Sequence, residues 1–226
     1  MPIDAVGDLA ERLDAGAHAA GVELPPRQRH QLLRFVALLM HWNRVYNLTA
    51  VREPADMLRQ HLLDCLAIVP SLRRQTAGHG ARLLDVGSGA GLPGIVLAVT
   101  MPELAVTCVD AVGKKASFIR QAAAELGLGA LQVQHARVES LRSTSFDIVV
   151  SRAFASLAHF ARATDACVRH PALEDDGVWL AMKGRLPVDE LNSLPAGVEV
   201  FHVEQMRIPG FDAERCLIWM RPSQAP

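Results

Sequence analysis

The spacing of hydrophobic residues differs between the N-terminal third of the chain and the rest. Up to about residue 75, apolar side chains such as Leu9, Leu13 and Ala17 recur every three or four positions, which is the spacing of one face of an amphipathic helix. This pattern predicts three helices, over residues 4–20, 27–43 and 54–69. His61 shares the apolar face of the third helix, where we interpret it as a hydrogen-bonded core residue and keep a catalytic role as the alternative.

From residue 81 onward, short apolar runs alternate with helical stretches, the pattern of a parallel sheet covered on both faces. Five strands are predicted, at 83–86, 105–110, 131–134, 146–150 and 178–182. Helices are predicted between and after them, at 93–100, 113–126, 155–169 and 187–192. The last two apolar runs are joined by too few residues for a helix, so they are expected to form an antiparallel hairpin, 198–206 with 214–221.

These elements predict an α/β fold in two parts. An N-terminal helical extension spans residues 1–75, and a Rossmann-like domain with a mostly parallel sheet spans residues 76–226. The polar segment at 75–80 is interpreted as the hinge between them.

A glycine-rich turn follows the first predicted strand, in the segment LLDVGSGAGLPG (83–94). Glycines in such a turn let backbone N–H groups come close to a ligand. Gly89, Gly91 and Gly94 match the GxGxxG pattern of dinucleotide-binding turns, and Asp110 stands about as far downstream as a ribose-binding acid does. A NAD(P)-dependent oxidoreductase is therefore one interpretation.

The acid before the turn favours a different ligand. Asp85 stands at the strand end ahead of Gly87 and Gly89, where a carboxylate is awkward for a pyrophosphate but favourable for a cation. S-adenosylmethionine carries a sulfonium and an ammonium, and Asp110 would then hold its ribose. Five parallel strands with a terminal hairpin resemble the class I S-adenosylmethionine-dependent methyltransferase architecture more than a dinucleotide-binding one.

Further candidate residues follow the other strands, because ligands of such sheets bind at the carboxyl ends of the strands. Val138 and Glu139 follow the third strand, where they could wall the adenine and bind its amino group. The three lysines of the chain and two arginines also come just after predicted strands: Lys114, Lys115, Arg152, Lys183 and Arg185. Each alone could be a solvated surface charge, but together they suggest a phosphate-bearing substrate such as RNA.

Composition narrows the classes of protein to which the chain can belong. The formal net charge is −1 and 50% of the residues are hydrophobic, which suits a folded domain with a sizeable core. No apolar run is long enough for a membrane span, and the start MPIDAVG has no signal-peptide pattern, so we expect a cytoplasmic protein. The cysteines show no metal-ligand spacing and are interpreted as buried thiols: Cys65, Cys108, Cys167 and Cys216.

Several segments together resemble the RsmG family, also called GidB, the bacterial guanine-N7 methyltransferases of small-subunit rRNA. The similarity spans about residues 25–221 and rests on five segments: HWNRVYNLTAVREPADMLRQHLLDCLAI (41–68), LLDVGSGAGLPGIVLA (83–98), VDAVGKKASFIRQ (109–121), ARVES (136–140) and VVSRAFASL (149–157). The resemblance implies methyl transfer to ring nitrogen 7 of a guanine in the decoding-region loop of 16S rRNA.

The same resemblance implies a set of cofactor-binding positions: Gly87, Leu92, Val138, Glu139 and Arg152. Ring nitrogen 7 has an in-plane lone pair and loses no proton, so no general base is expected and Arg152 is given a positioning role. The expected partner is 16S rRNA, the small ribosomal subunit or its precursor, bound by a monomer. A non-catalytic RNA-binding module with a vestigial pocket is a third interpretation.

Overall fold

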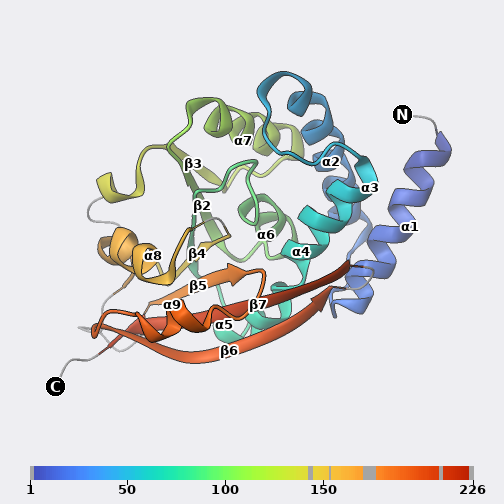
Figure 1. Cartoon of the computed structure of the whole chain (residues 1–226). Coiled ribbons are helices and arrows are strands. Elements are labelled where there is room, and N and C mark those ends of the chain that lie inside the picture. Colours follow the sequence, from blue (N-terminus) through green and yellow to red (C-terminus); the bar gives the residue numbers. More distant parts are fainter. Residues whose placement is uncertain (1–2, 142–144, 153, 170–176, 209–210, 224–226) are drawn as a thin grey trace.

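The computed structural model describes residues 3–141, 145–152, 154–169, 177–208 and 211–223 of the 226-residue chain. They contain a seven-stranded sheet with the strand order β3-β2-β1-β4-β5-β7-β6 (Figure 1). Five strands pair in parallel: β1 (Arg82–Val86), β2 (Ala105–Asp110), β3 (Gln132–His135), β4 (Ile148–Ser151) and β5 (Val178–Lys183). The predicted terminal hairpin is confirmed, because β6 (Val198–Ile208) and β7 (Phe211–Pro222) pair antiparallel and β7 pairs antiparallel with β5.

Adjacent residues on the strands face two separate cores. On β4, Ile148 and Val150 pack in one core, whereas Val149 between them packs in the other. The first core includes α6 (Gly94–Thr100) and α7 (Gly113–Leu126), and the second includes α8 (Leu157–Thr164) and the partly buried Leu191 of α9 (Val188–Asn192). The sheet is therefore covered on both faces, as its apolar strands predict.

The N-terminal third of the chain is helical, with two differences from the prediction. It contains α1 (Ile3–Ala19), α2 (Pro26–Tyr46), α3 (Pro54–Met57), the π-helical turn η1 (Leu58–Leu63), α4 (Asp64–Leu66) and α5 (Val69–Thr76). The predicted single helix at 54–69 is thus interrupted by a π-turn, and the first two residues of the segment interpreted as a hinge, 75–80, belong to α5. The helix α5 is not predicted, because its mostly polar sequence shows no apolar periodicity. Pro70 is tolerated there because it stands in the first turn of the helix.

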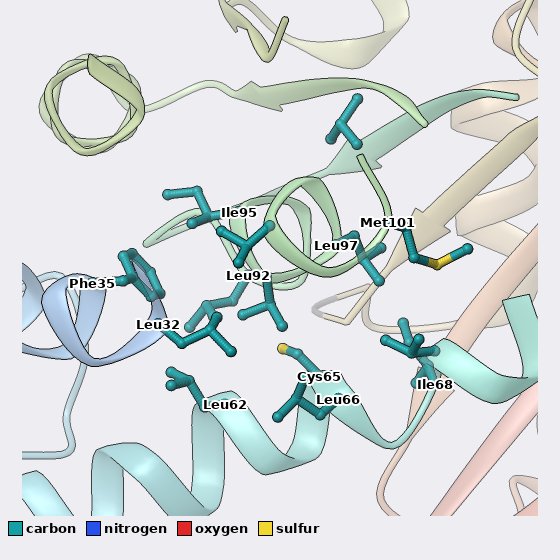
Figure 2. Packing of buried hydrophobic residues seen from close by; sticks show 14 of the residues in the cluster. Leu32, Phe35, Leu62, Cys65, Leu66, Ile68, Leu92, Ile95, Leu97 and Met101 are labelled. Atoms are coloured by element: carbon teal, nitrogen blue, oxygen red, sulfur yellow. The ribbon is translucent and has the colours of Figure 1, made fainter. Parts of the chain in front are cut away.

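The extension and the sheet share one hydrophobic core. Figure 2 shows Leu32 and Phe35 of α2 and Leu62 of η1 beside Leu92 and Ile95, at the start of α6. The Phe35 and Phe118 rings lie 6.3 Å apart and join α2 to α7.

Polar contacts fix how α2 lies against α7. Arg34 Nη2 donates to Glu125 Oε2 at 2.7 Å, and the Gln31 side-chain amide donates to Leu126 O at 2.7 Å. The start of α2 is therefore near the end of α7. Since α7 begins at the carboxyl edge of the sheet, α2 runs antiparallel to it and ends at that edge.

Leu62→Ala is expected to lower the free energy of unfolding by about 2–5 kcal/mol, because this fully buried side chain leaves a cavity between the extension and α6. Amide hydrogens of α2 and β4 should then exchange faster by the same factor, since one core holds both. Hydrogen exchange read by mass spectrometry compares the two segments within one protein. Val45→Ala, at an exposed position of α2, is the control, and faster exchange confined to α2 would show that the extension folds separately.

Candidate active site

The turn between β1 and α6 is shaped by glycine. Gly87, Gly89 and Gly91 have φ angles of 67°, 59° and 83°, in the left-handed region that other residues rarely adopt. The Gly87 N–H donates to Val109 O at 2.9 Å, which ties the turn to the end of β2. The predicted glycine turn therefore lies where β1 and β2 end side by side.

Asp85, near the end of β1, is a fully buried carboxylate next to this turn. Its Oδ2 accepts the backbone N–H of Gly94 at 2.9 Å, while Oδ1 has no hydrogen-bond partner among the described residues. Burial raises the pKa of Asp85 to about 7. A Cβ at Gly94 would collide with Cys108 Sγ, so glycine is needed for α6 to begin this close to the carboxylate. The site thus holds a carboxylate oxygen that can accept from a cation.

Asp110 joins the glycine turn to the turn that follows β2. Its Oδ2 accepts the Gly89 N–H and its Oδ1 accepts the Val112 N–H, each at 2.8 Å. An ionised carboxylate has about four lone-pair sites. Both Asp110 oxygens therefore hold the turns in place and keep the capacity to accept one more hydrogen bond each.

The other residues predicted to bind a cofactor differ in exposure. Val138 and Glu139 begin the short helix η2 (Val138–Ser140) after β3, where Val138 is buried and Glu139 is exposed. The Ala136 N–H donates to Asp110 O at 3.2 Å, so η2 starts beside the end of β2. Leu92 is buried in the core between α6 and the extension (Figure 2), where its side chain serves packing.

Arg152, directly after β4, contacts the helical extension. Its Nη1 donates to Gln60 O and to Asp64 Oδ2, both at 3.3 Å. Asp64 Oδ1 in turn accepts from Arg215 Nε, on β7, at 2.6 Å. Neither Asp64 nor Arg215 is predicted from the sequence, because the two ion pairs join residues 88 and 151 positions apart. The only signal is that Asp64 lies inside a segment that resembles the RsmG family.

His61 is a core residue, which confirms the simpler interpretation of its place on the third helix. Its Nε2 lies 2.8 Å from Thr49 Oγ1 in a hydrogen bond, and the Thr49 N–H donates to Asn43 Oδ1 at 2.9 Å. Burial, followed by the charge of Arg152, lowers the pKa of His61 to about 4. The imidazole is therefore neutral near pH 7 and fastens the loop between α2 and α3.

The predicted basic residues form two groups on one edge of the sheet. Lys114 and Lys115 lie in the first turn of α7 after β2, while Lys183 and Arg185 lie at or after the end of β5, about 14 Å and three strands away. The Lys183 ammonium is 2.8 Å from Glu190 Oε2 and its side chain is only 14% exposed, whereas Arg185 is exposed. The structure thus places the cations on one edge without gathering them at one point.

All four cysteines are free and buried, as predicted. Among the residues that the structure describes, no three metal-ligating side chains form a cluster that could hold an ion. The described helices include none with the length and apolar character of a membrane span.

Known proteins are similar to nearly the whole chain. The family model described as GidB, rRNA small subunit methyltransferase G, matches residues 28–218. Ribosomal RNA small subunit methyltransferase G of Methylibium petroleiphilum is 59% identical over 97% of this chain and 96% of its own. The protein of the same name from Acidovorax ebreus is 55% identical over 95% of this chain and 96% of its own.

Solved structures agree on the fold. Magnesium protoporphyrin IX methyltransferase from Synechocystis, solved with bound S-adenosylmethionine, matches with a TM-score of 0.56 and 13% identity over 84% of this chain and 97% of its own. This likeness and the strand order confirm the predicted class I methyltransferase fold. Because the family model covers most of the chain and two full-length relatives are more than half identical, the chain belongs to the GidB family of rRNA small subunit methyltransferase G proteins.

Proposed function

We propose that this protein transfers the methyl group of S-adenosylmethionine to ring nitrogen 7 of a guanine in the decoding-region loop of 16S rRNA. The observation that carries the proposal is the unpartnered, buried Asp85 oxygen beside a left-handed glycine turn, in a chain of the GidB family. The substrate is 16S rRNA, alone or within the small ribosomal subunit or its precursor. The enzyme acts as a monomer in the cytoplasm.

The residues present fit a cofactor that is cationic at one end. When bound, S-adenosylmethionine supplies a methyl group made electrophilic by its sulfonium. The ionised Asp85 Oδ1 stabilises positive charge at the end of β1, where burial leaves it without solvent. Apart from its two neighbours in the chain, no atom of the described residues lies within 4 Å of the place where a Cβ would stand at Gly87, so a ligand can approach the backbone there.

Residues at the end of β2 and after β3 can bind the adenosine part of S-adenosylmethionine. Asp110 keeps acceptor capacity for two ribose hydroxyls while its oxygens hold Gly89 and Val112. Glu139 is exposed beside the end of β2, where its carboxylate can accept from the adenine amino group, and Val138 supplies an apolar wall. Leu92 contributes through the position of its backbone, since its side chain is buried in the core.

Catalysis in this proposal needs alignment and no proton transfer. Guanine nitrogen 7 attacks with an in-plane lone pair, so a base is not required, and the rate gain comes from holding nucleophile and methyl group in line in a dehydrated site. Arg152 is the positioning residue, because it stands at the end of the strand next to β1 and lies close enough to Asp85 to influence its ionisation.

RNA phosphates would meet cations on both sides of the site. Lys114 and Lys115 flank it at the start of α7, and Arg185 flanks it after β5. Lys183 contributes less directly, because its ammonium already pairs with Glu190. Basic side chains on either side of the candidate cofactor site suit a folded RNA that spans this site.

The function itself is testable with purified protein. Labelled methyl groups should pass from S-adenosylmethionine to 16S rRNA or to small subunits, and borohydride and aniline treatment should cleave the product at one guanine. S-adenosylhomocysteine should bind in a calorimetric titration and NADH should not. Binding of NADH alone would indicate an oxidoreductase, and cofactor binding with no transfer to any RNA form would indicate a non-catalytic module.

Cofactor affinity should rise with pH between about pH 5.5 and pH 7.5, by up to about tenfold per pH unit. The raised pKa of Asp85, about 7, keeps most of the free protein protonated at this residue at pH 6. A bound ammonium favours the ionised form, so binding releases a proton and is stronger at higher pH. Calorimetry with S-adenosylhomocysteine in two buffers of different ionisation enthalpy measures that proton.

The matched variant for this pH dependence is Asp85→Asn, which keeps an acceptor for the Gly94 N–H but cannot ionise. Its affinity should be weaker and independent of pH in the same range. A wild-type affinity that does not change with pH, with no proton released, would remove Asp85 from the cofactor site.

Single changes at the edge should separate RNA binding from cofactor binding. Lys114→Ala and Arg185→Ala should each reduce the slope of log affinity against log salt by roughly 0.7 for single-stranded RNA, and leave the affinity for S-adenosylhomocysteine unchanged. Filter binding of 16S rRNA fragments at several salt concentrations measures the slope. Arg27→Ala, at the opposite edge beside Leu128 and Leu131, is the control and should leave the slope unchanged.

A further inference from the structure

Asp64 is a buried carboxylate held between two guanidinium groups. Its side chain is 5% exposed, and its two oxygens accept from different arginines, Oδ2 from Arg152 Nη1 at 3.3 Å and Oδ1 from Arg215 Nε at 2.6 Å. The arginine side chains are themselves only 26% and 20% exposed. Water therefore screens these charges little, and the Asp64 carboxylate links the two arginines.

The three residues come from separate parts of the fold. Asp64 begins α4 in the helical extension, Arg152 follows β4, and Arg215 lies on β7. Gln60 O, in the π-turn before α4, accepts a second hydrogen bond from the same Arg152 nitrogen. Two acceptors on one helical run thus set the direction of the Arg152 side chain.

We propose that Asp64 is a positioning residue for methyl transfer, holding Arg152 in the orientation in which it serves the cofactor site. The inference rests on the proposed role of Arg152 in cofactor binding. It makes the helical extension part of the active site, because a carboxylate of the extension controls a guanidinium of the sheet domain.

Two physical arguments favour a functional reason for this pair. A buried ion pair loses solvation, and an apolar pair of the same size is often as stable or more so, so stability alone is a weak reason to place charges here. Within the described residues, Nη1 is the only Arg152 nitrogen with a hydrogen-bond partner. The remaining donors of the guanidinium keep their capacity for a ligand while the Asp64 carboxylate fixes the group.

A double-mutant cycle tests the coupling. Asp64→Asn and Arg152→Ala are each expected to raise the dissociation constant of S-adenosylhomocysteine about tenfold, the effect of one charge-assisted hydrogen bond. If Asp64 acts through Arg152, the combined variant should bind as weakly as Arg152→Ala alone and no weaker. Calorimetry below the unfolding temperature of each variant measures the constants.

Two further variants separate positioning from stability. Asp147→Asn breaks a comparable 2.6 Å ion pair with Arg169 at the amino end of β4, and should lower the unfolding temperature without changing cofactor affinity. Asp64→Asn combined with Arg215→Gln removes the carboxylate together with the Arg215 charge that it neutralises. It should unfold at a higher temperature than Asp64→Asn yet still bind weakly, because Arg152 lacks its partner.

The outcomes are distinct. Unchanged affinity in Arg152→Ala would refute the proposed role of Arg152 itself. Weaker binding in Arg152→Ala with wild-type affinity in Asp64→Asn would refute the positioning role of Asp64. Additive losses in the combined variant, or recovery of affinity together with stability in the charge-balanced variant, would do the same.

Discussion

A buried negative charge at the end of β1 is the constraint on which the site depends. Asp85 is removed from solvent and has one satisfied oxygen, so its ionised form stays unfavourable until a cation provides the missing interaction. The hydrogen bond that it does make, from the Gly94 N–H, also fixes where α6 begins. In the proposed function, affinity for a cationic ligand and the packing of α6 against the sheet both depend on this one carboxylate.

The helical extension follows from the composition of α6. Its sequence, GIVLAVT, is apolar except for the last residue, and six of its seven residues are buried. A helix that is hydrophobic all round must be covered on every side, and the sheet covers only one. The extension buries the opposite side with α2 and η1 and brings Asp64 to Arg152. The need to cover α6 thus explains why the extension is present. The Asp64–Arg152 ion pair is what the extension adds to the site.

Local patterns predict most of the fold, because strand and helix periods are properties of neighbouring residues. The glycine turn, Asp85 and Asp110 are predicted for the same reason, since each stands at a strand end. The pairing of Lys183 with Glu190 and that of Asp64 with two arginines depend on tertiary contact. The distance from Lys114 and Lys115 to the basic residues at or after the end of β5 depends on the order of the strands in the sheet. The spacing of hydrophobic residues along the chain does not specify that order. The π-turn in the third predicted helix cannot be recognised from the spacing of apolar residues, because its residues continue the buried face of that helix.

A carboxyl pKa near 7 in an active site often marks a general base, yet the geometry here argues against that role for Asp85. Its Oδ2 already accepts from the Gly94 amide, and in the proposed complex its Oδ1 accepts from the cofactor cation, so neither oxygen is left to take a proton from a target base. His61 is no better suited, because burial lowers its pKa to about 4, which makes it a weak base, and its Nε2 is hydrogen-bonded to Thr49. Methylation at a ring nitrogen that loses no proton is consistent with both facts. The raised pKa of Asp85 then follows from its burial, which makes an ionised carboxylate costly until the proposed cationic ligand supplies a partner.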